Sequence, residues 1–176
     1  DKPSITSSLT QRKMNSLYGS LQLNWDGWLF LDVTARNDWS STMSKENRSY
    51  FYPSVSLSAV ISDMVQKNGG SMPDWFSFAK VRASFAEVGN DLDPYQLYNV
   101  YTISKDANGN SMASAGSTLF DSSVKSELIK SWEVGADLRF FNNRFGIDAA
   151  WYKTNATNQL LNIPMDAFSG YESRKV

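Results

Sequence analysis

Apolar residues recur at every second position along most of this chain. Alternation of this kind predicts a β-strand with one apolar and one polar face, because successive strand side chains point to opposite sides of a sheet. In residues 17–25 the odd positions are Leu, Gly, Leu, Leu and Trp, whereas the even positions are Tyr, Ser, Gln and Asn. The same rule predicts six strands, at residues 17–25, 29–36, 54–61, 80–88, 132–140 and 145–152. The chain is therefore predicted to be all-β and antiparallel.

Short and long connections alternate between these strands. Asp26-Gly27 and Asn142-Asn143 are tight-turn dipeptides, and a moderate joint near residues 68–73 links the third strand to the fourth. Residues 37–49 and the much longer stretch 89–130 form the other connections. Because successive antiparallel connections lie at opposite ends of a sheet, the short ones gather at one end. Transmembrane β-barrels have this asymmetry, with short periplasmic turns and long extracellular loops.

Side-chain parity also predicts how the strands pair. A two-residue turn at Asp26-Gly27 would place apolar side chains opposite polar ones, since a one-residue slip inverts a whole face. We therefore expect a three-residue connection, 26–28, with Gly27 at positive φ, so that Leu23 lies opposite Leu31 and Leu21 opposite Val33. At Asn142-Asn143 a two-residue loop conserves the faces and places Phe140 opposite Phe145.

The aromatic residues collect near the ends of the predicted strands, as the interface belts of a membrane barrel do. Those near the short turns are Trp25, Trp28, Trp75, Phe76, Phe140, Phe141 and Phe145. Those near the long connections are Trp39, Tyr50, Phe51, Tyr52, Trp132, Trp151 and Tyr152. The alternative is a soluble β-sandwich in which these rings form the core or, as in a carbohydrate-binding module, an exposed ligand platform.

Composition excludes several classes of chemistry. The chain has no Cys and no His, so a thiolate nucleophile, a Ser-His-Asp relay, a disulfide framework and a soft-ligand zinc site are all excluded. A net charge of -1 without a basic block argues against nucleic acid as a partner. Asp91 and Asp93 suit a turn better than a catalytic pair, and 106–110 matches a plain turn better than a calcium loop. We predict neither an enzyme nor a metal or cofactor site.

Four stretches resemble one family: 31–42 (LDVTARNDWSST), 50–58 (YFYPSVSLS), 80–91 (KVRASFAEVGND) and 130–144 (KSWEVGADLRFFNNR). They resemble the SusC/RagA-like, TonB-dependent outer-membrane transporters of Bacteroidetes-type bacteria. The resemblance implies a plugged barrel of the 22-strand class in the bacterial outer membrane, surrounded by lipid. It also implies energised uptake of glycan or peptide fragments with a SusD-like surface lipoprotein as partner. Residues 1–176 are then expected to be part of one barrel domain, with the plug, the TonB-contacting segment and the other strands outside this chain.

Two sets of residues are candidates for function. The candidates on the polar, lumen-facing side of the predicted wall are Asp32, Arg36, Arg82, Glu133, Asp137, Arg139 and Asp148. The alternative for each of them is a solvated or mutually paired scaffold charge. The candidates for contact with cargo or a partner in the long connection 89–130 are Asp91, Asp93, Tyr95, Tyr98 and Tyr101. The alternative for the three tyrosines is a loop that packs on itself.

Overall fold

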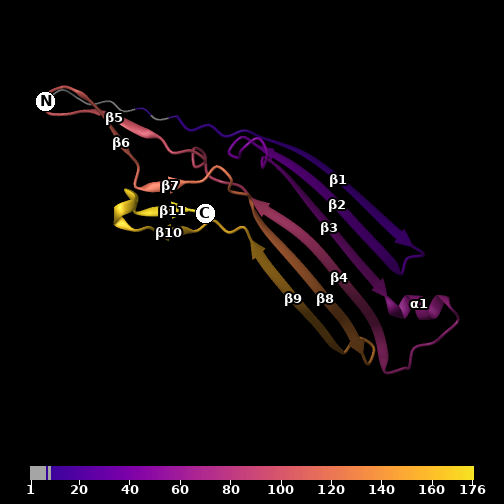
Figure 1. The fold of residues 1–176 in the computed structure, drawn as a ribbon. Helices are drawn as coiled ribbons and strands as arrows, with labels where there is room; N and C mark the ends of the chain where they lie inside the picture. Colours follow the sequence, from indigo (N-terminus) through magenta and orange to yellow (C-terminus); the bar gives the residue numbers. More distant parts are fainter. Residues whose placement is uncertain (1–6, 8) are drawn as a thin grey trace.

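Six long strands lie side by side in one antiparallel sheet (Figure 1) in a computed structural model that describes residue 7 and residues 9–176. They are β1 (Met14–Trp25), β2 (Leu29–Ser40), β3 (Ser49–Val60), β4 (Phe76–Asn90), β8 (Glu127–Phe140) and β9 (Phe145–Thr157). Their order in the sheet is β1-β2-β3-β4-β8-β9, so each strand pairs with the next long strand along the chain. This up-and-down meander confirms the six predicted strands.

The strands extend beyond the predicted bounds at the end where the long connections lie. β1 begins at Met14 and not at residue 17, and β2 continues to Ser40 and not only to residue 36. β8 begins at Glu127 and β9 continues to Thr157. Polar residues occupy both faces of these extensions, so the alternation that predicted the strands ends before the hydrogen-bonded ladder does. The sheet therefore continues past its apolar band.

The predicted register is confirmed at both tight turns. Leu23 pairs with Leu31 and Leu21 with Val33, across a three-residue connection in which Gly27 has a φ of 72°. Glycine adopts this left-handed conformation without steric cost. At the second turn Phe140 pairs with Phe145, as predicted. The connection between the two strands has four residues, 141–144, and not the two expected, because the ladder ends at this pair.

The sheet has two chemically different faces. The outer face, defined as the side that carries Leu21, Val33 and Leu57, leaves large apolar side chains exposed. Its exposed large apolar residues are Leu17, Leu21, Leu23, Trp25, Trp39, Phe51, Val55, Leu57, Val81, Trp132, Val134, Phe145, Ile147 and Trp151. Within the described residues no second sheet packs on this face, so the β-sandwich alternative is wrong. The chain is a segment of a transmembrane β-barrel wall.

Aromatic rings mark both ends of this apolar band. Near the short turns Trp75 stacks on Phe140, with ring centroids 6.0 Å apart. Near the long connections Phe85 lies 4.3 Å from Trp132 between centroids. Trp25 pairs with Leu29, ten residues before Trp39, which corresponds to about 33 Å along the strand or about 25 Å along the barrel axis at a tilt of about 40°. That separation matches an apolar band of about 25 Å.

The remaining elements lie at the two ends of the sheet. A short helix, α1 (Ile61–Lys67), follows β3 at the short-turn end, where the Nζ of Lys67 lies 2.7 Å from a carboxylate oxygen of Asp26. At the other end β5 (Tyr101–Lys105) and β6 (Ser111–Ala115) form a hairpin that extends away from the sheet (Figure 1). β10 (Asn162–Pro164), β11 (Ser173–Lys175) and β7 (Thr118–Phe120) form a small sheet, and η1 (Ala167–Ser169) is one 3-10 turn. The sequence analysis predicted none of these elements.

The buried apolar cluster lies at the long-loop end and not within the sheet. Met43, Tyr50, Leu92 and Leu97 are buried there, and Tyr52, Val124 and Leu160 pack against them. Each connection at this end contributes a residue, so the loops share one core. In the described part of the chain no helix is long and apolar enough to cross a membrane.

Candidate functional site at the inner face and the loop end

Ion pairs connect neighbouring strands across the inner face, the polar side opposite the outer face. Arg82 on β4 lies 3.3 Å from a carboxylate oxygen of Glu133 on β8 and 3.0 Å from one of Asp148 on β9. The predicted lumen-facing residues all share this face. Their other ion pairs are Arg36 with Asp38 at 2.7 Å and Arg139 with Asp137 at 3.1 Å. Asp32 takes part in no ion pair between described residues.

Arg82 reaches two strands because Gly135 leaves room for its guanidinium. Arg82 and Gly135 are direct cross-strand partners. A Cβ at position 135 would lie 2.7 Å from the Arg82 Cζ, so any larger residue would displace the guanidinium. The pairing among these charges agrees with the alternative that they are mutually paired scaffold groups, and their functional role stays a prediction.

Asp91 ties three segments together at the loop end. Its side chain is 3% exposed, and one carboxylate oxygen lies 2.6 Å from the Nη2 of Arg12, ahead of β1. The other oxygen accepts hydrogen bonds from the hydroxyls of Ser40, at the end of β2, and Thr42, the latter at 3.0 Å. Asp91 therefore uses both oxygens inside the protein and holds the start of the long connection against the wall.

The other predicted contact residues are accessible. Asp93 is exposed, and Tyr95, Tyr98 and Tyr101 are each more than half exposed. Tyr95 has a φ of 66°, and its hydroxyl accepts a hydrogen bond from the backbone N–H of Gln11. Tyr101 begins β5 and leads into the projecting hairpin. The structure thus separates Asp91, which is internal, from four residues that face solvent.

A polar hollow of about 400 Å³ lies beside Asp91. The lining residues are Arg12, Asn90, Asp91, Leu92, Asp93, Gln96, Glu127, Gln159, Leu160, Leu161 and Lys175. Amides, carboxylates and cations here supply hydrogen-bond donors and acceptors, and the leucines supply apolar surface. Such a mixture suits a polar ligand such as a peptide backbone or a sugar. The sequence analysis missed this hollow because its residues come from distant parts of the chain.

Two loop carboxylates beyond the membrane-spanning strands have lowered pKa values. The hydroxyl of Ser123, together with its backbone N–H and the Arg174 guanidinium, lowers the pKa of Asp121 to about 2. Hydrogen bonds from the backbone and side chain of Asn110 lower the pKa of Asp106 in the β5–β6 turn. Asp106 therefore stabilises a turn, as the plain-turn interpretation of 106–110 predicts.

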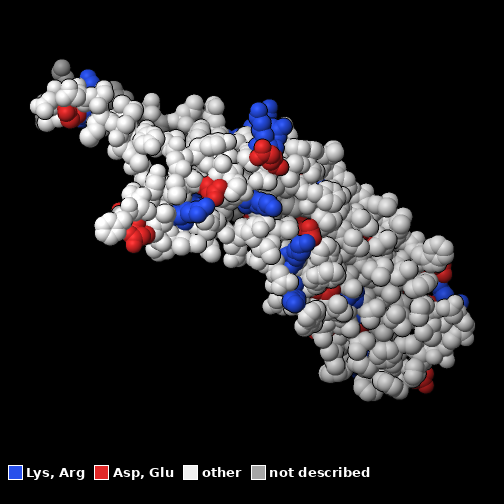
Figure 2. All heavy atoms as spheres, viewed as in Figure 1, with Lys and Arg blue, Asp and Glu red and all other residues white. Residues whose placement is uncertain are grey.

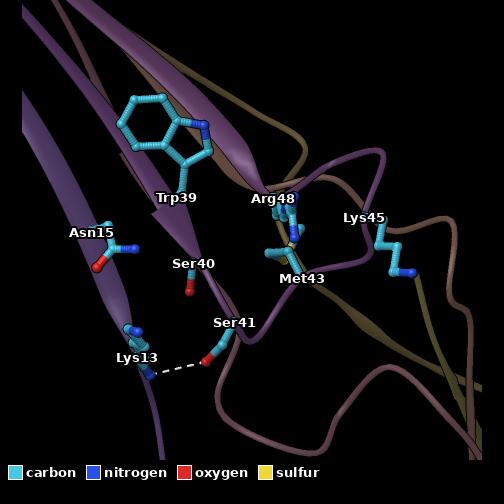
Figure 3. Close-up of a pocket in the computed structure, with 8 residues that line it drawn as sticks. All are labelled: Lys13, Asn15, Trp39, Ser40, Ser41, Met43, Lys45 and Arg48. Atoms are coloured by element: carbon cyan, nitrogen blue, oxygen red, sulfur yellow. Dashed lines mark hydrogen bonds between the residues drawn. The ribbon is translucent and has the colours of Figure 1, made fainter.

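A second hollow, of about 490 Å³, opens beside Trp39 (Figure 3). We name it the cationic hollow; its lining residues are Lys13, Asn15, Trp39, Ser40, Ser41, Met43, Lys45 and Arg48. Figure 3 shows Lys13 and Asn15 on β1 and its approach, across from Trp39 and Ser41 at the end of β2. Three of these side chains, those of Lys13, Lys45 and Arg48, are cationic. The sequence analysis did not single them out, because they are spread over 36 positions of the chain.

Charged side chains are distributed unevenly over the face drawn in Figure 2. Figure 2 shows Lys, Arg, Asp and Glu gathered over the half with the loops, and few of them over the half formed by the strands. Within the described residues, no group of three or more Asp or Glu side chains is placed to hold a metal ion. On the face drawn, the loop half therefore shows most of the charged side chains.

The family model described as "TonB dependent receptor-like, beta-barrel" matches residues 1–174. Two proteins of Formosa agariphila are similar in sequence: TonB-dependent receptor P3, 26% identical over 175 residues, and TonB-dependent receptor P26, 25% identical over 176 residues. These alignments cover 96% and 97% of this chain but only 17% of each relative. The chain thus spans about one sixth of the length of the curated relatives it matches.

Solved structures with a similar fold include one described as the RagAB peptide transporter, with a TM-score of 0.80 and 23% identity over 93% of this chain and 18% of that one. The RagAB peptide importer in its 'open-open' state gives a TM-score of 0.79 at 23% identity, with the same coverage. The siderophore receptor PirA from Pseudomonas aeruginosa gives 0.58 at 14% identity, over 93% of this chain and 28% of that one. These likenesses support the barrel fold.

Proposed function

Because this chain belongs to the TonB-dependent receptor β-barrel family, we propose that it forms part of the wall of a transporter that imports glycan or peptide fragments. Members of this family are receptors and transporters of the outer membrane, not enzymes. A SusD-like surface lipoprotein is the proposed partner at the loop end. The plug and the remaining strands belong to other parts of the same barrel protein, and TonB binds through those parts.

The observation that carries this proposal is the two-faced sheet with its structured elements concentrated at one end. Lipid contacts the apolar outer face between the two rows of aromatic rings. The inner face presents ion-paired charges to the lumen or to a plug. The loop end, with its own buried cluster, presents exposed rings and the polar hollow outside the membrane, where cargo and a lipoprotein arrive.

The chemistry of the loop end favours a neutral, polar cargo. Tyr98 and Tyr101 offer aromatic faces, on which sugar rings and peptide side chains stack. Asn90, Gln96 and Gln159 in the polar hollow offer amide donors and acceptors. Both glycan and peptide fragments match this surface, and the fold relative RagAB is described as a peptide transporter and as a peptide importer. Peptide and glycan uptake are therefore the two activities to measure.

The test replaces Tyr95, Tyr98 and Tyr101 by Ala in the full-length protein. After the amount of protein in the outer membrane has been measured, uptake of labelled peptides, uptake of labelled glycan fragments and co-purification of the lipoprotein are compared with wild type. We expect at least one of the three to fall, by about two- to tenfold if one ring stacks on the ligand with about 0.5–1.5 kcal/mol. A matched control, Phe141→Ala, removes an exposed ring from the short-turn end and should change none of them.

Unchanged uptake and co-purification in the triple variant would show that the tyrosines make no functional contact. Tyr→Phe replacements at the same three positions separate stacking from hydrogen bonding by the hydroxyl. If the Phe variant keeps full activity, the rings act through stacking alone.

A further inference from the structure

Hydroxyl side chains form one row across the inner face of the six-stranded sheet. Ser20 on β1 pairs with Thr34 on β2, and Thr34 pairs in turn with Ser54 on β3. On the last two strands Ser131 pairs with Thr154. Ala86 on β4 is the cross-strand partner of both Ser54 and Ser131, so it joins the two parts without a hydroxyl of its own. We name this set the hydroxyl row; its members are Ser20, Thr34, Ser54, Ser131 and Thr154.

The side chains of the hydroxyl row are uncharged and accessible. Ser20 and Thr154 are exposed, and the other three are half-buried. The hydroxyl oxygens of Thr34 and Ser54 lie 2.5 Å apart, and those of Ser131 and Thr154 lie 3.3 Å apart. In each pair one hydroxyl donates to the other, so the accepting hydroxyl keeps its own proton for a ligand.

The row is inclined to the membrane and rises toward the loop end from β1 to β9. Ser20 lies five residues from Trp25, at the short-turn end of β1, whereas Thr154 lies nine residues from Phe145, at the same end of β9. Four residues correspond to about 13 Å along a strand, or about 10 Å along the barrel axis at a tilt of about 40°. A molecule that moves along the row therefore also moves along the axis of the barrel.

The polar hollow of the loop end lies above the row on the same strands. Glu127, at the start of β8, and its cross-strand partner Asn90 both line the hollow. Glu127 shares the inner-face parity of Ser131 and lies four residues beyond it. One pair of this face, Val88 with Ile129, lies between the hollow and the row. The row is thus the next polar surface that a molecule meets on its way from the hollow into the lumen.

We propose that the hydroxyl row is a transit site, along which neutral polar cargo exchanges hydrogen bonds as it leaves the polar hollow and passes down the wall. This inference rests on the proposed import function and adds the path that the cargo takes. Hydroxyls both donate and accept, so they match sugar hydroxyls and peptide amides alike. Each such bond replaces a bond to water and is weak in net terms. Several weak contacts in sequence let a molecule enter and also leave.

The charges on either side of the row make it selective for neutral groups. Arg36 belongs to the next row toward the loop end, and Asp32 and Glu133 belong to the next row toward the short turns. Hydrogen bonds with an ionised partner are roughly twice as strong as those between neutral groups. A charged group on the cargo is therefore held longer at the flanking rows than a neutral group is held at the hydroxyl row.

The experiment measures uptake by cells that carry the full-length protein, after its amount in the outer membrane has been measured. The probes are a labelled mixture of neutral oligosaccharides and a labelled mixture of neutral, end-blocked peptides. The test variant, Thr34→Val/Ser54→Ala/Ser131→Ala/Thr154→Val, removes both members of each bonded pair and leaves no hydroxyl unpaired. The swap variant, Thr34→Ser/Ser54→Thr/Ser131→Thr/Thr154→Ser, keeps every hydroxyl and exchanges only the methyl groups.

The matched control removes four exposed hydroxyls from the β5–β6 hairpin, outside the lumen wall. It is Thr102→Val/Ser104→Ala/Ser111→Ala/Ser114→Ala.

We expect the maximal uptake rate of the test variant to fall about two- to tenfold, as for the loss of about one net hydrogen bond. The probe concentration that gives half the maximal rate should stay at its wild-type value, because the loop end is unchanged. The swap variant and the matched control should import as wild type does. A lower rate for one mixture alone identifies which cargo uses the row.

Uptake by the test variant at the wild-type maximal rate would overturn the inference and leave the proposed import function standing. Equal losses in the swap variant or in the matched control would show that the hydroxyls of the row are not the cause. A higher half-maximal concentration at an unchanged maximal rate would assign the row to initial binding and not to transit. Absence of uptake of both mixtures by the wild-type protein would overturn the import function, and this inference with it.

Discussion

Gly89 on β4 provides a sharp test of how the loop end is packed. A Cβ at this position would lie 2.6 Å from the Tyr52 hydroxyl oxygen and 2.8 Å from Cζ, whereas carbon atoms in contact are normally about 3.5–4.0 Å apart. The ring must therefore move by about 1 Å to accept an alanine. Tyr52 stacks against Tyr50, with centroids 6.1 Å apart, and Tyr50 belongs to the buried cluster. The movement must disturb this cluster.

We expect Gly89→Ala to lower the free energy of local opening at the loop end by about 1–3 kcal/mol, the usual cost of overpacking. Gly135→Ala is the matched control on the neighbouring strand, because its Cβ meets the end of the flexible, part-exposed Arg82 side chain. At position 135 the loss of the Arg82 ion pairs costs about 0–1 kcal/mol. Replacing glycine by alanine within a strand gains about 0.5–1 kcal/mol, because alanine loses less backbone entropy on folding. The net effect of Gly135→Ala should be close to zero.

Hydrogen exchange of the full-length protein in detergent, read on the amides of residues 91–97, measures the opening free energy. A Tyr52→Ala background supplies a double-mutant cycle: with the ring removed, Gly89→Ala should cost no more than about 0.5 kcal/mol. The reasoning is refuted if Gly89→Ala leaves exchange unchanged, or if its cost persists without the Tyr52 ring.

Two further predictions concern the loop carboxylates. Asp91→Asn should raise hydrogen exchange and proteolysis of residues 91–97, since a hydrogen bond to a charged partner is worth about 1.5–3 kcal/mol. The control is Asp93→Asn, at an exposed position. Equal effects of the two substitutions would contradict the internal role of Asp91. The Asp121 contacts with Ser123 and Arg174 should persist from neutral pH down to about pH 4 and be lost as pH falls through about 2, because the folded-state pKa is lowered to about 2 from an unperturbed value of about 3.9. Exchange of the Ser123 amide against pH checks this, and a change centred near pH 4 would be inconsistent with it.

The six strands were predictable because the residues in their membrane-spanning parts obey one local rule. Lipid on one side and a polar lumen on the other impose alternation along each strand, so parity alone placed Leu23 opposite Leu31 and fixed the three-residue turn at Gly27. The inner-face positions of Arg82, Glu133 and Asp148 followed from the same parity. Parity does not predict which charged residues form ion pairs with one another. Arg82 reaches Asp148 on β9 because Gly135, which lies between them, has no side chain.

The loop end was less predictable because its contacts join residues far apart in the chain. Asp91 meets Arg12 across 79 positions, and β7 pairs with β11 in parallel across 55 positions. No local pattern encodes such contacts. Asp91 and Asp93 look equivalent in sequence, yet one is internal and the other is exposed. Helix α1 was missed because it has only seven residues and follows β3 without a side-chain cap.

One local signal at the loop end does persist after the apolar alternation stops. Continuing the parity of β2 beyond Arg36 assigns Asp38 and Ser40 to the inner side and Trp39 to the outer side. The structure agrees: Asp38 and Ser40 are buried, with Ser40 bonded to Asp91, and Trp39 is exposed beside the cationic hollow. The last residues of β2 thus supply the anchor of the long connection on one face and an exposed aromatic ring on the other. Side-chain parity therefore remains informative in a barrel strand even where hydrophobicity no longer alternates.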